Sequence, residues 1–86
     1  MRDIAHMQVK GRVAQALLQL RDEFGLTPDG AIGLTLSRQD LASLVGATYE
    51  TVFRIINELA QEGLIRLDGK QIAVADAAGL LDYTRE

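Results

Sequence analysis

Cysteine and tryptophan are missing from this sequence, and it has only one histidine and one proline among its 86 residues. Without cysteine a chain has neither disulfides nor thiolate metal ligands, and a lone histidine cannot build a zinc site by itself. No paired carboxylates, no Ser/His/Asp or Cys/His set and no metal-ligand spacing stand out, and we expect His6 to be an exposed polar residue. We therefore expect no enzyme, no metal site and no cofactor.

Long hydrophobic runs are also missing. No stretch reaches the apolar length of a membrane span, and the N-terminus lacks the apolar core of a signal peptide. The length and the hydrophobic content of 48% suit one small domain with a single modest core. We expect a cytoplasmic protein without membrane contact.

Positive charge is scarce, since nine lysines and arginines face twelve acidic residues, which gives a net charge of −3. An autonomous nucleic-acid binder normally carries a basic footprint. DNA binding therefore requires the cations of the central region to converge on one surface while the acidic side chains face away. The cations concerned are Arg38, Arg54, Arg66 and Lys70.

What the sequence does contain is a pair of short helices between residues 37 and 63. Ser37 with Asp40 has the spacing of a capping box and starts the first helix. Gly46 suits the left-handed backbone that ends a helix, and Thr48 can cap the next one. Two helices joined across about three residues have the spacing of a helix-turn-helix, which in DNA-binding proteins lays its second helix in the major groove.

Helical periodicity assigns a buried side to each of these helices. The apolar positions are Leu41, Leu44 and Val45 in the first, and Val52, Ile55, Ile56 and Leu59 in the second. Opposite the second set lie groups able to hydrogen-bond base edges, namely Glu50, Arg54, Asn57 and Gln61, flanked by Tyr49 and Phe53. The alternative is a solvated face held by Glu50–Arg54 and Arg54–Glu58 pairs, which periodicity alone favours.

The segment before this pair predicts one amphipathic helix from Gln8 to near Gly25, because apolar residues recur at helical spacing. The recurring positions are Val9, Val13, Ala16, Leu17, Leu20 and Phe24. Gly11 lowers helix propensity, so either a neighbour approaches closely there or the helix starts later. Residues 27–30 then indicate a turn, and alternation over 32–36 predicts a short strand.

The segment after the pair predicts a hairpin in which residues 64–67 and 71–74 flank Asp68, Gly69 and Lys70. A hairpin directly after such a helix is a wing. Arg66 and Lys70 can reach phosphates from it, or equally a charged turn can simply be solvated. Asp76 is expected to cap a last short helix that ends near Tyr83.

Residues 37–65, SRQDLASLVGATYETVFRIINELAQEGLI, resemble the DNA-binding signature of the Crp/Fnr family of bacterial transcription regulators. The matching positions are Arg38, Asp40, Leu41, Ala42, Gly46, Glu50, Thr51, Val52, Arg54, Ile56, Leu59, Gly63, Leu64 and Ile65. Residues 13–18 also resemble the helix that opens the C-terminal domain of the family. Many members carry arginine just before the glutamate, where this chain has Tyr49.

The resemblance implies an α+β, mostly α fold, a winged helix-turn-helix with a three-helix core and a small β-hairpin wing. It implies a DNA-binding domain over residues 8–86, preceded by a lead-in over residues 1–7 left from a linker or dimerisation helix. The chain would then be the C-terminal domain of a longer regulator that carries an N-terminal effector-binding domain. We expect the full-length form to be a homodimer and this chain a monomer, with RNA polymerase as a further candidate partner.

Two functions remain open from the sequence. In the first, the domain reads double-stranded DNA with Glu50 and Arg54 at base edges and Tyr49 or Phe53 at a thymine methyl, and Asn57 is a further expected DNA-binding residue. The expected phosphate contacts are Arg38, Thr48, Thr51 and Lys70. In the second, the same fold is a protein-interaction module that does not bind DNA, as the acidic balance allows.

Overall fold

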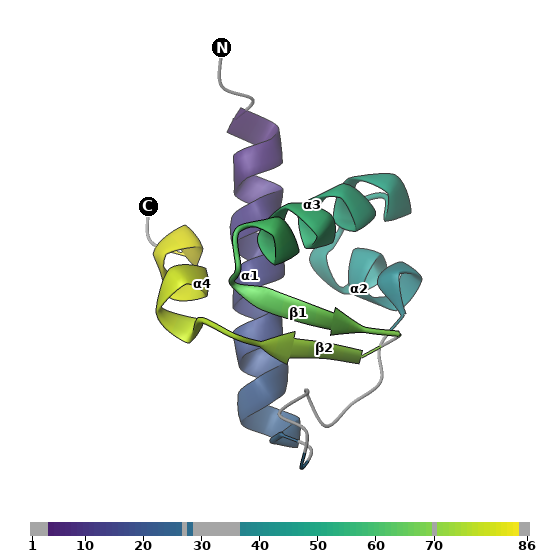
Figure 1. Ribbon diagram of the computed structural model, residues 1–86. Coiled ribbons are helices and arrows are strands. Elements are labelled where there is room, and N and C mark those ends of the chain that lie inside the picture. Colours follow the sequence, from purple (N-terminus) through teal and green to yellow (C-terminus); the bar gives the residue numbers. More distant parts are fainter. Residues whose placement is uncertain (1–3, 27, 29–36, 70, 85–86) are drawn as a thin grey trace.

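The computed structural model describes residues 4–26, 28, 37–69 and 71–84. Its elements are α1 (Ile4–Phe24), α2 (Arg38–Val45), α3 (Tyr49–Gln61), β1 (Ile65–Asp68), β2 (Gln71–Val74) and α4 (Ala77–Thr84). The long helix α1 forms the axis of the molecule, with α2 and α3 on one side of it and α4 on the other (Figure 1). The predicted winged helix-turn-helix is confirmed.

The turn between α2 and α3 follows the predicted capping chemistry. The backbone N–H of Asp40 donates to Ser37 Oγ over 3.1 Å, and the N–H of Thr51 donates to Thr48 Oγ1 over 3.2 Å. Gly46 has a φ of 74°, the left-handed conformation that ends α2. Gly46 and Thr48 thus end α2 and start α3 across the turn, while Ser37 caps the start of α2.

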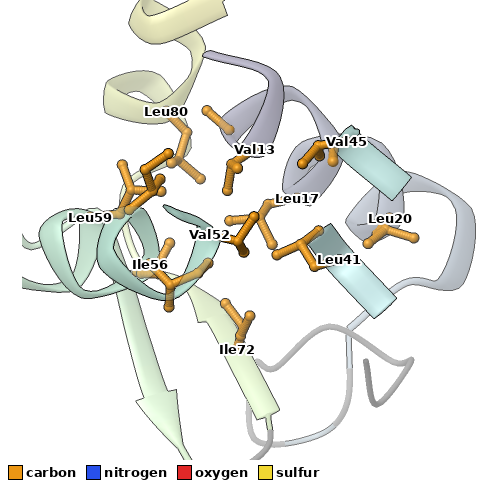
Figure 2. Close-up of a cluster of buried hydrophobic side chains, with 14 of the residues drawn as sticks. Val13, Leu17, Leu20, Leu41, Val45, Val52, Ile56, Leu59, Ile72 and Leu80 are labelled. Atoms are coloured by element: carbon orange, nitrogen blue, oxygen red, sulfur yellow. The ribbon is translucent and has the colours of Figure 1, made fainter. Parts of the chain in front are cut away.

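The core lies where α1, α2 and α3 meet, and the hairpin and α4 close it (Figure 2). All four predicted positions of α3 are fully buried, namely Val52, Ile55, Ile56 and Leu59. Leu41 and Val45 of α2 join them, but Leu44 is 59% exposed, so its predicted burial is wrong. The reason is that Ala42 completes the buried side of α2, which turns Leu44 toward solvent.

Helix α1 begins at Ile4, not at the predicted Gln8. Gly11 lies inside it because a neighbour approaches closely, as one of the two sequence interpretations required. A Cβ at this position would lie 2.7 Å from the backbone carbonyl oxygen of Tyr83 in α4. Phe24, the last residue of the helix, is 51% exposed. Its spacing indicated a core position, so this prediction is wrong.

The hairpin has the predicted position, with β1 antiparallel to β2 and Ile65 opposite Val74. Gly69 at its turn has a φ of 61°, and the N–H of Gly79 donates to Asp76 Oδ1 over 3.1 Å, which confirms the predicted cap of α4. The predicted strand at 32–36 and the side chain of Lys70 lie outside the described residues.

Candidate nucleic-acid interface

The exposed side of α3 carries the predicted hydrogen-bonding row. Glu50, Arg54 and Asn57 are all exposed, on the side opposite the core positions. They line an open hollow of about 860 Å³ together with Phe53, Glu58, Ala60 and Gln61. One helix thus presents carboxylate, guanidinium and amide groups to solvent on a single face, as base reading requires.

Arg54 does not form the helical ion pairs that a merely solvated face would use. Within the described part of the chain, its guanidinium is paired with neither Glu50 nor Glu58. Glu58 instead contacts Lys10 and His6 of α1. The charge of Arg54 therefore remains available to an external acceptor.

The first turn of α3 brings two of the predicted phosphate-contacting residues together. The hydroxyl of Thr48 donates to Thr51 Oγ1 over 2.9 Å, while Thr48 Oγ1 accepts the N–H of Thr51. Arg38 lies half-buried at the first position of α2, and Arg66 is exposed on β1. The expected convergence of the cations with Lys70 stays a prediction.

Tyr49 and Phe53 stack on each other along one edge of this face. Their ring centroids are 6.0 Å apart and the ring planes differ by 22°. The two residues are 47% and 46% exposed, respectively. We call this pair the aromatic stack; it adds an apolar edge to the polar row.

The sequence did not predict the polar cluster that anchors the opposite end of α3. Lys10 of α1 is 5% exposed, and its Nζ lies 3.1 Å from Glu58 Oε1 and donates to Glu62 Oε2 over 2.7 Å. The hydroxyl of Tyr83 donates to Glu62 Oε1 over 2.6 Å, and Lys10 Nζ lies 4.7 Å from the centre of the Tyr83 ring.

His6 Nε2 lies 3.0 Å from Glu58 Oε1, with 19% of its side chain exposed, so its prediction as an exposed residue is wrong. We call these five residues the lysine cluster.

A signal for this cluster was present in the spacing. His6 and Lys10 are four residues apart, as are Glu58 and Glu62, so each pair lies on one helical face. Only the crossing of α1 over the end of α3 shows that the two faces meet, and that crossing depends on tertiary packing.

The pKa values of the cluster follow from this geometry. Burial alone would lower the pKa of Lys10, but its hydrogen bonds to Glu62, Glu58 and Tyr83 outweigh burial and raise it. Burial alone would raise the pKa values of Glu58 and Glu62. Hydrogen bonds from His6 and Lys10 outweigh burial at Glu58 and lower its pKa. Hydrogen bonds from Lys10 and Tyr83 do the same at Glu62. Burial and the hydrogen bond to Glu62 raise the pKa of Tyr83. At neutral pH the cluster holds charged pairs.

Two further features of the described residues bear on function. No three His, Asp or Glu side chains among them gather in a way that could hold a metal ion. No helix in the described ranges is both long and apolar enough to cross a membrane.

Sequence comparison relates the chain to known regulators. Residues 11–83 match a family described as "Crp-like helix-turn-helix domain". The chain is 40% identical over 85 residues to a CRP-like cAMP-activated global transcriptional regulator of Mycobacterium tuberculosis, and 37% identical over 78 residues to the transcriptional regulator SdrP of Thermus thermophilus. These alignments cover 96% and 90% of this chain but only 38% and 39% of the relatives. The curated relatives are transcription regulators and not enzymes.

Structure comparison gives the same answer. The crystal structure of the Thermus thermophilus catabolite activator protein superposes with a TM-score of 0.80 at 34% identity, covering 94% of this chain and 36% of that one. The structure of FixK2 from Bradyrhizobium japonicum superposes with a TM-score of 0.79 at 29% identity, covering 91% and 39%. In each case the similarity covers nearly all of this chain and about a third of the other.

Proposed function

We propose that this chain, which belongs to the family of Crp-like helix-turn-helix domains, binds double-stranded DNA sequence-specifically in a bacterial transcription regulator. The observation that carries the proposal is the exposed polar row of α3, which forms no ion pair with the described residues and lies on a helix whose other side is fully buried. Such a helix enters the major groove as one rigid unit.

The residues of α3 have distinct roles in this proposal. Arg54 donates to the O6 and N7 acceptors of a guanine, Glu50 accepts from a cytosine amino group, and Asn57 pairs with an adenine. Thr48 and Thr51 at the start of α3 contact phosphate oxygens, with Arg38 and Lys70 contributing charge.

The lysine cluster supports DNA binding by a net acidic chain. Glu58 and Glu62 lie on α3 and its C-cap, where free carboxylates would repel a phosphate backbone. Because Lys10 neutralises part of their charge and draws them toward α1, the two carboxylates repel a phosphate backbone less than free ones would. The interaction-module alternative has no comparable support and is not favoured by the family assignment.

The wider setting is part of the same proposal. The regulator would act as a homodimer in the cytoplasm, with an effector-binding domain N-terminal to this one and RNA polymerase as a further partner. Residues 1–7 would lead in from that domain, and residues 8–86 would form the DNA-binding unit.

The test separates base reading from charge attraction. A duplex is first selected from a random library by this chain, and binding is followed by fluorescence anisotropy at several salt concentrations on the selected and a scrambled duplex. Arg54→Ala should lose about 1 to 3 kcal/mol on the selected duplex and relax preference at one base pair. Lys70→Ala should weaken both duplexes about equally and reduce the salt slope by about one phosphate.

Arg12→Ala is the matched control, because Arg12 is exposed on α1, outside the hollow along α3. It removes one positive charge without touching that face. The proposal fails if Arg54→Ala behaves like Arg12→Ala on both duplexes. It fails equally if no duplex is enriched even when the chain is dimerised by a fused coiled coil, which raises its affinity.

A further inference from the structure

The chain has four aromatic residues, two tyrosines and two phenylalanines, and two of these four form the exposed aromatic stack on α3. Adjacent exposed aromatic side chains form a contiguous apolar patch, and such patches often mark binding sites. Tyr83, by contrast, is packed against the core and hydrogen-bonded to Glu62. Phe24, the fourth aromatic residue, is also exposed at the end of α1, but among the described residues only Tyr49 and Phe53 form an exposed aromatic pair.

The position of the stack follows from the helical period. At about 100° per residue, Tyr49 and Phe53 lie within about 40° of each other, between the polar row and the buried side. Phe53 also lines the hollow that contains Glu50, Arg54 and Asn57. The stack is therefore continuous with the proposed DNA interface and forms its apolar edge.

From this arrangement we propose that the aromatic stack recognises the C5-methyl group of a pyrimidine next to the bases read by the polar row. This inference rests on the proposed function. The methyl group of thymine is the apolar group that base edges present in the major groove. The same chemistry is offered by 5-methylcytosine.

The geometry favours methyl contact over stacking on an unpaired base. The two rings form one nearly parallel apolar surface, with centroids 6.0 Å apart and planes that differ by 22°. About half of each residue is exposed, which suits a small apolar group approaching from the groove. Stacking of a base against one ring is instead the mode of single-strand binders.

The experiment uses this chain and a duplex that it selects from a random library. Each thymine of that duplex is replaced in turn by uracil, which removes only the methyl group. At one or two adjacent positions affinity should fall about fourfold, the effect of burying one methyl group. Replacing the same T·A pair by C·G and then by 5-methylcytosine·G should show affinity rising again with the methyl group.

Variants assign the effect to the stack. Phe53→Ala and Tyr49→Ala should bind the thymine duplex more weakly and should no longer distinguish thymine from uracil at the sensitive position. Arg12→Ala, at an exposed position of α1 outside the hollow, should keep the full difference.

The outcomes separate this inference from the proposed function. Enrichment of a duplex with no thymine position sensitive to uracil would overturn the methyl recognition and leave DNA binding in place. Sensitivity that persists unchanged in both alanine variants would also overturn it, because the methyl group would then be read elsewhere. Failure to enrich any duplex would overturn both. Tighter binding to the single strand than to the duplex would replace methyl contact by base stacking.

Discussion

Lys10 shows how much one side chain can organise in a small domain. It is the one charged residue that is fully buried among those described, and it reaches two carboxylates and an aromatic ring. A buried charge is tolerated only when it is paired and hydrogen-bonded, because an unpaired one loses its hydration without compensation.

Replacing Lys10 tests this role. Lys10→Met keeps most of the apolar stem but removes the ammonium, so the hydrogen bonds to Glu58 and Glu62 are lost. We expect a loss of about 1 to 3 kcal/mol in the free energy of unfolding, measured by urea denaturation. Arg12→Met, on the exposed side of the same helix, is the control and should change stability by less than about 0.5 kcal/mol. Equal midpoints for the two variants would contradict the assignment.

The pH dependence of stability follows from the same cluster. The pKa values of Glu58 and Glu62 are lowered from 4.5 in the folded chain, so the unfolded chain binds more protons as pH falls below that value. The stabilisation is therefore complete above about pH 4.5 and is lost below it, as pH falls through the folded-state pKa values. The pKa of Lys10 is raised from 10.5, so its contribution is complete below that pH and is lost as pH rises through the higher folded-state value.

Urea denaturation from pH 3 to pH 7 checks this expectation. Below about pH 4.5 the wild-type chain should lose stability more steeply than Lys10→Met. The difference between the two curves isolates the pairs that Lys10 forms, because the contacts of Glu58 with His6 and of Glu62 with Tyr83 are common to both chains. Parallel curves over this range would mean that the pairs do not persist in solution.

At the scale of elements, α3 depends on its packing. A helix of 13 residues is marginal by itself in water, so its buried side must hold it in place. Leu59 is fully buried, and Leu59→Ala should cost about 2 to 5 kcal/mol by leaving a cavity. Leu44→Ala removes the same atoms from an exposed site and should cost less than about 0.5 kcal/mol. Thermal melts of the two variants check this, and similar melting temperatures would refute the core assignment.

Gly11 lies at the contact between α1 and α4, where a substitution that favours the helix should nevertheless destabilise the fold. Gly11→Ala would gain about 1 kcal/mol of helix propensity in an isolated helix. Here the new Cβ meets the backbone carbonyl of Tyr83, which can move only if α4 moves. We expect a net loss of about 1 to 3 kcal/mol in chemical denaturation. Gln15→Ala, at an exposed position of the same helix, should be neutral or stabilising, and a stabilised Gly11→Ala would disprove the close approach.

Local signals predicted most of the fold. The caps at Ser37, Thr48 and Asp76 and the turn at Gly69 are determined by residues close in sequence, and all were predicted correctly. The exposed row of α3 followed from periodicity for the same reason. The predictions for Leu44 and Phe24 were wrong because helical spacing shows which face of a helix is apolar. It does not show how much of that face the neighbouring elements cover.

The lysine cluster could not be predicted in this way. His6 and Glu58 are separated by 52 positions, and their contact exists only because α1 crosses the end of α3. Tyr49 and Phe53 are close in sequence, but the geometry of their stacking depends on the rotamers that the two side chains adopt. Long-range polar contacts are thus the part of the site that needed the structure.

At the scale of the whole molecule, the expected behaviour is that of a monomer with weak affinity for DNA. A single domain contacts one half-site, whereas two linked domains gain from effective concentration. Sedimentation velocity should show one monomeric species. A two-stranded coiled coil fused before Ile4 should raise affinity for a two-half-site duplex by about 10²- to 10⁴-fold. A stable dimer of the unfused chain would contradict this expectation.

The lysine cluster has one more consequence, which is mechanical. It fastens the C-terminal end of α3 to the first turns of α1, which project beyond the other helices (Figure 1). A torque applied to these turns therefore acts on α3 directly through charged contacts, without first passing through α2 or the hairpin. His6 and Lys10 thus give α1 a polar grip on the C-terminal end of α3, beside the apolar packing that joins the two helices.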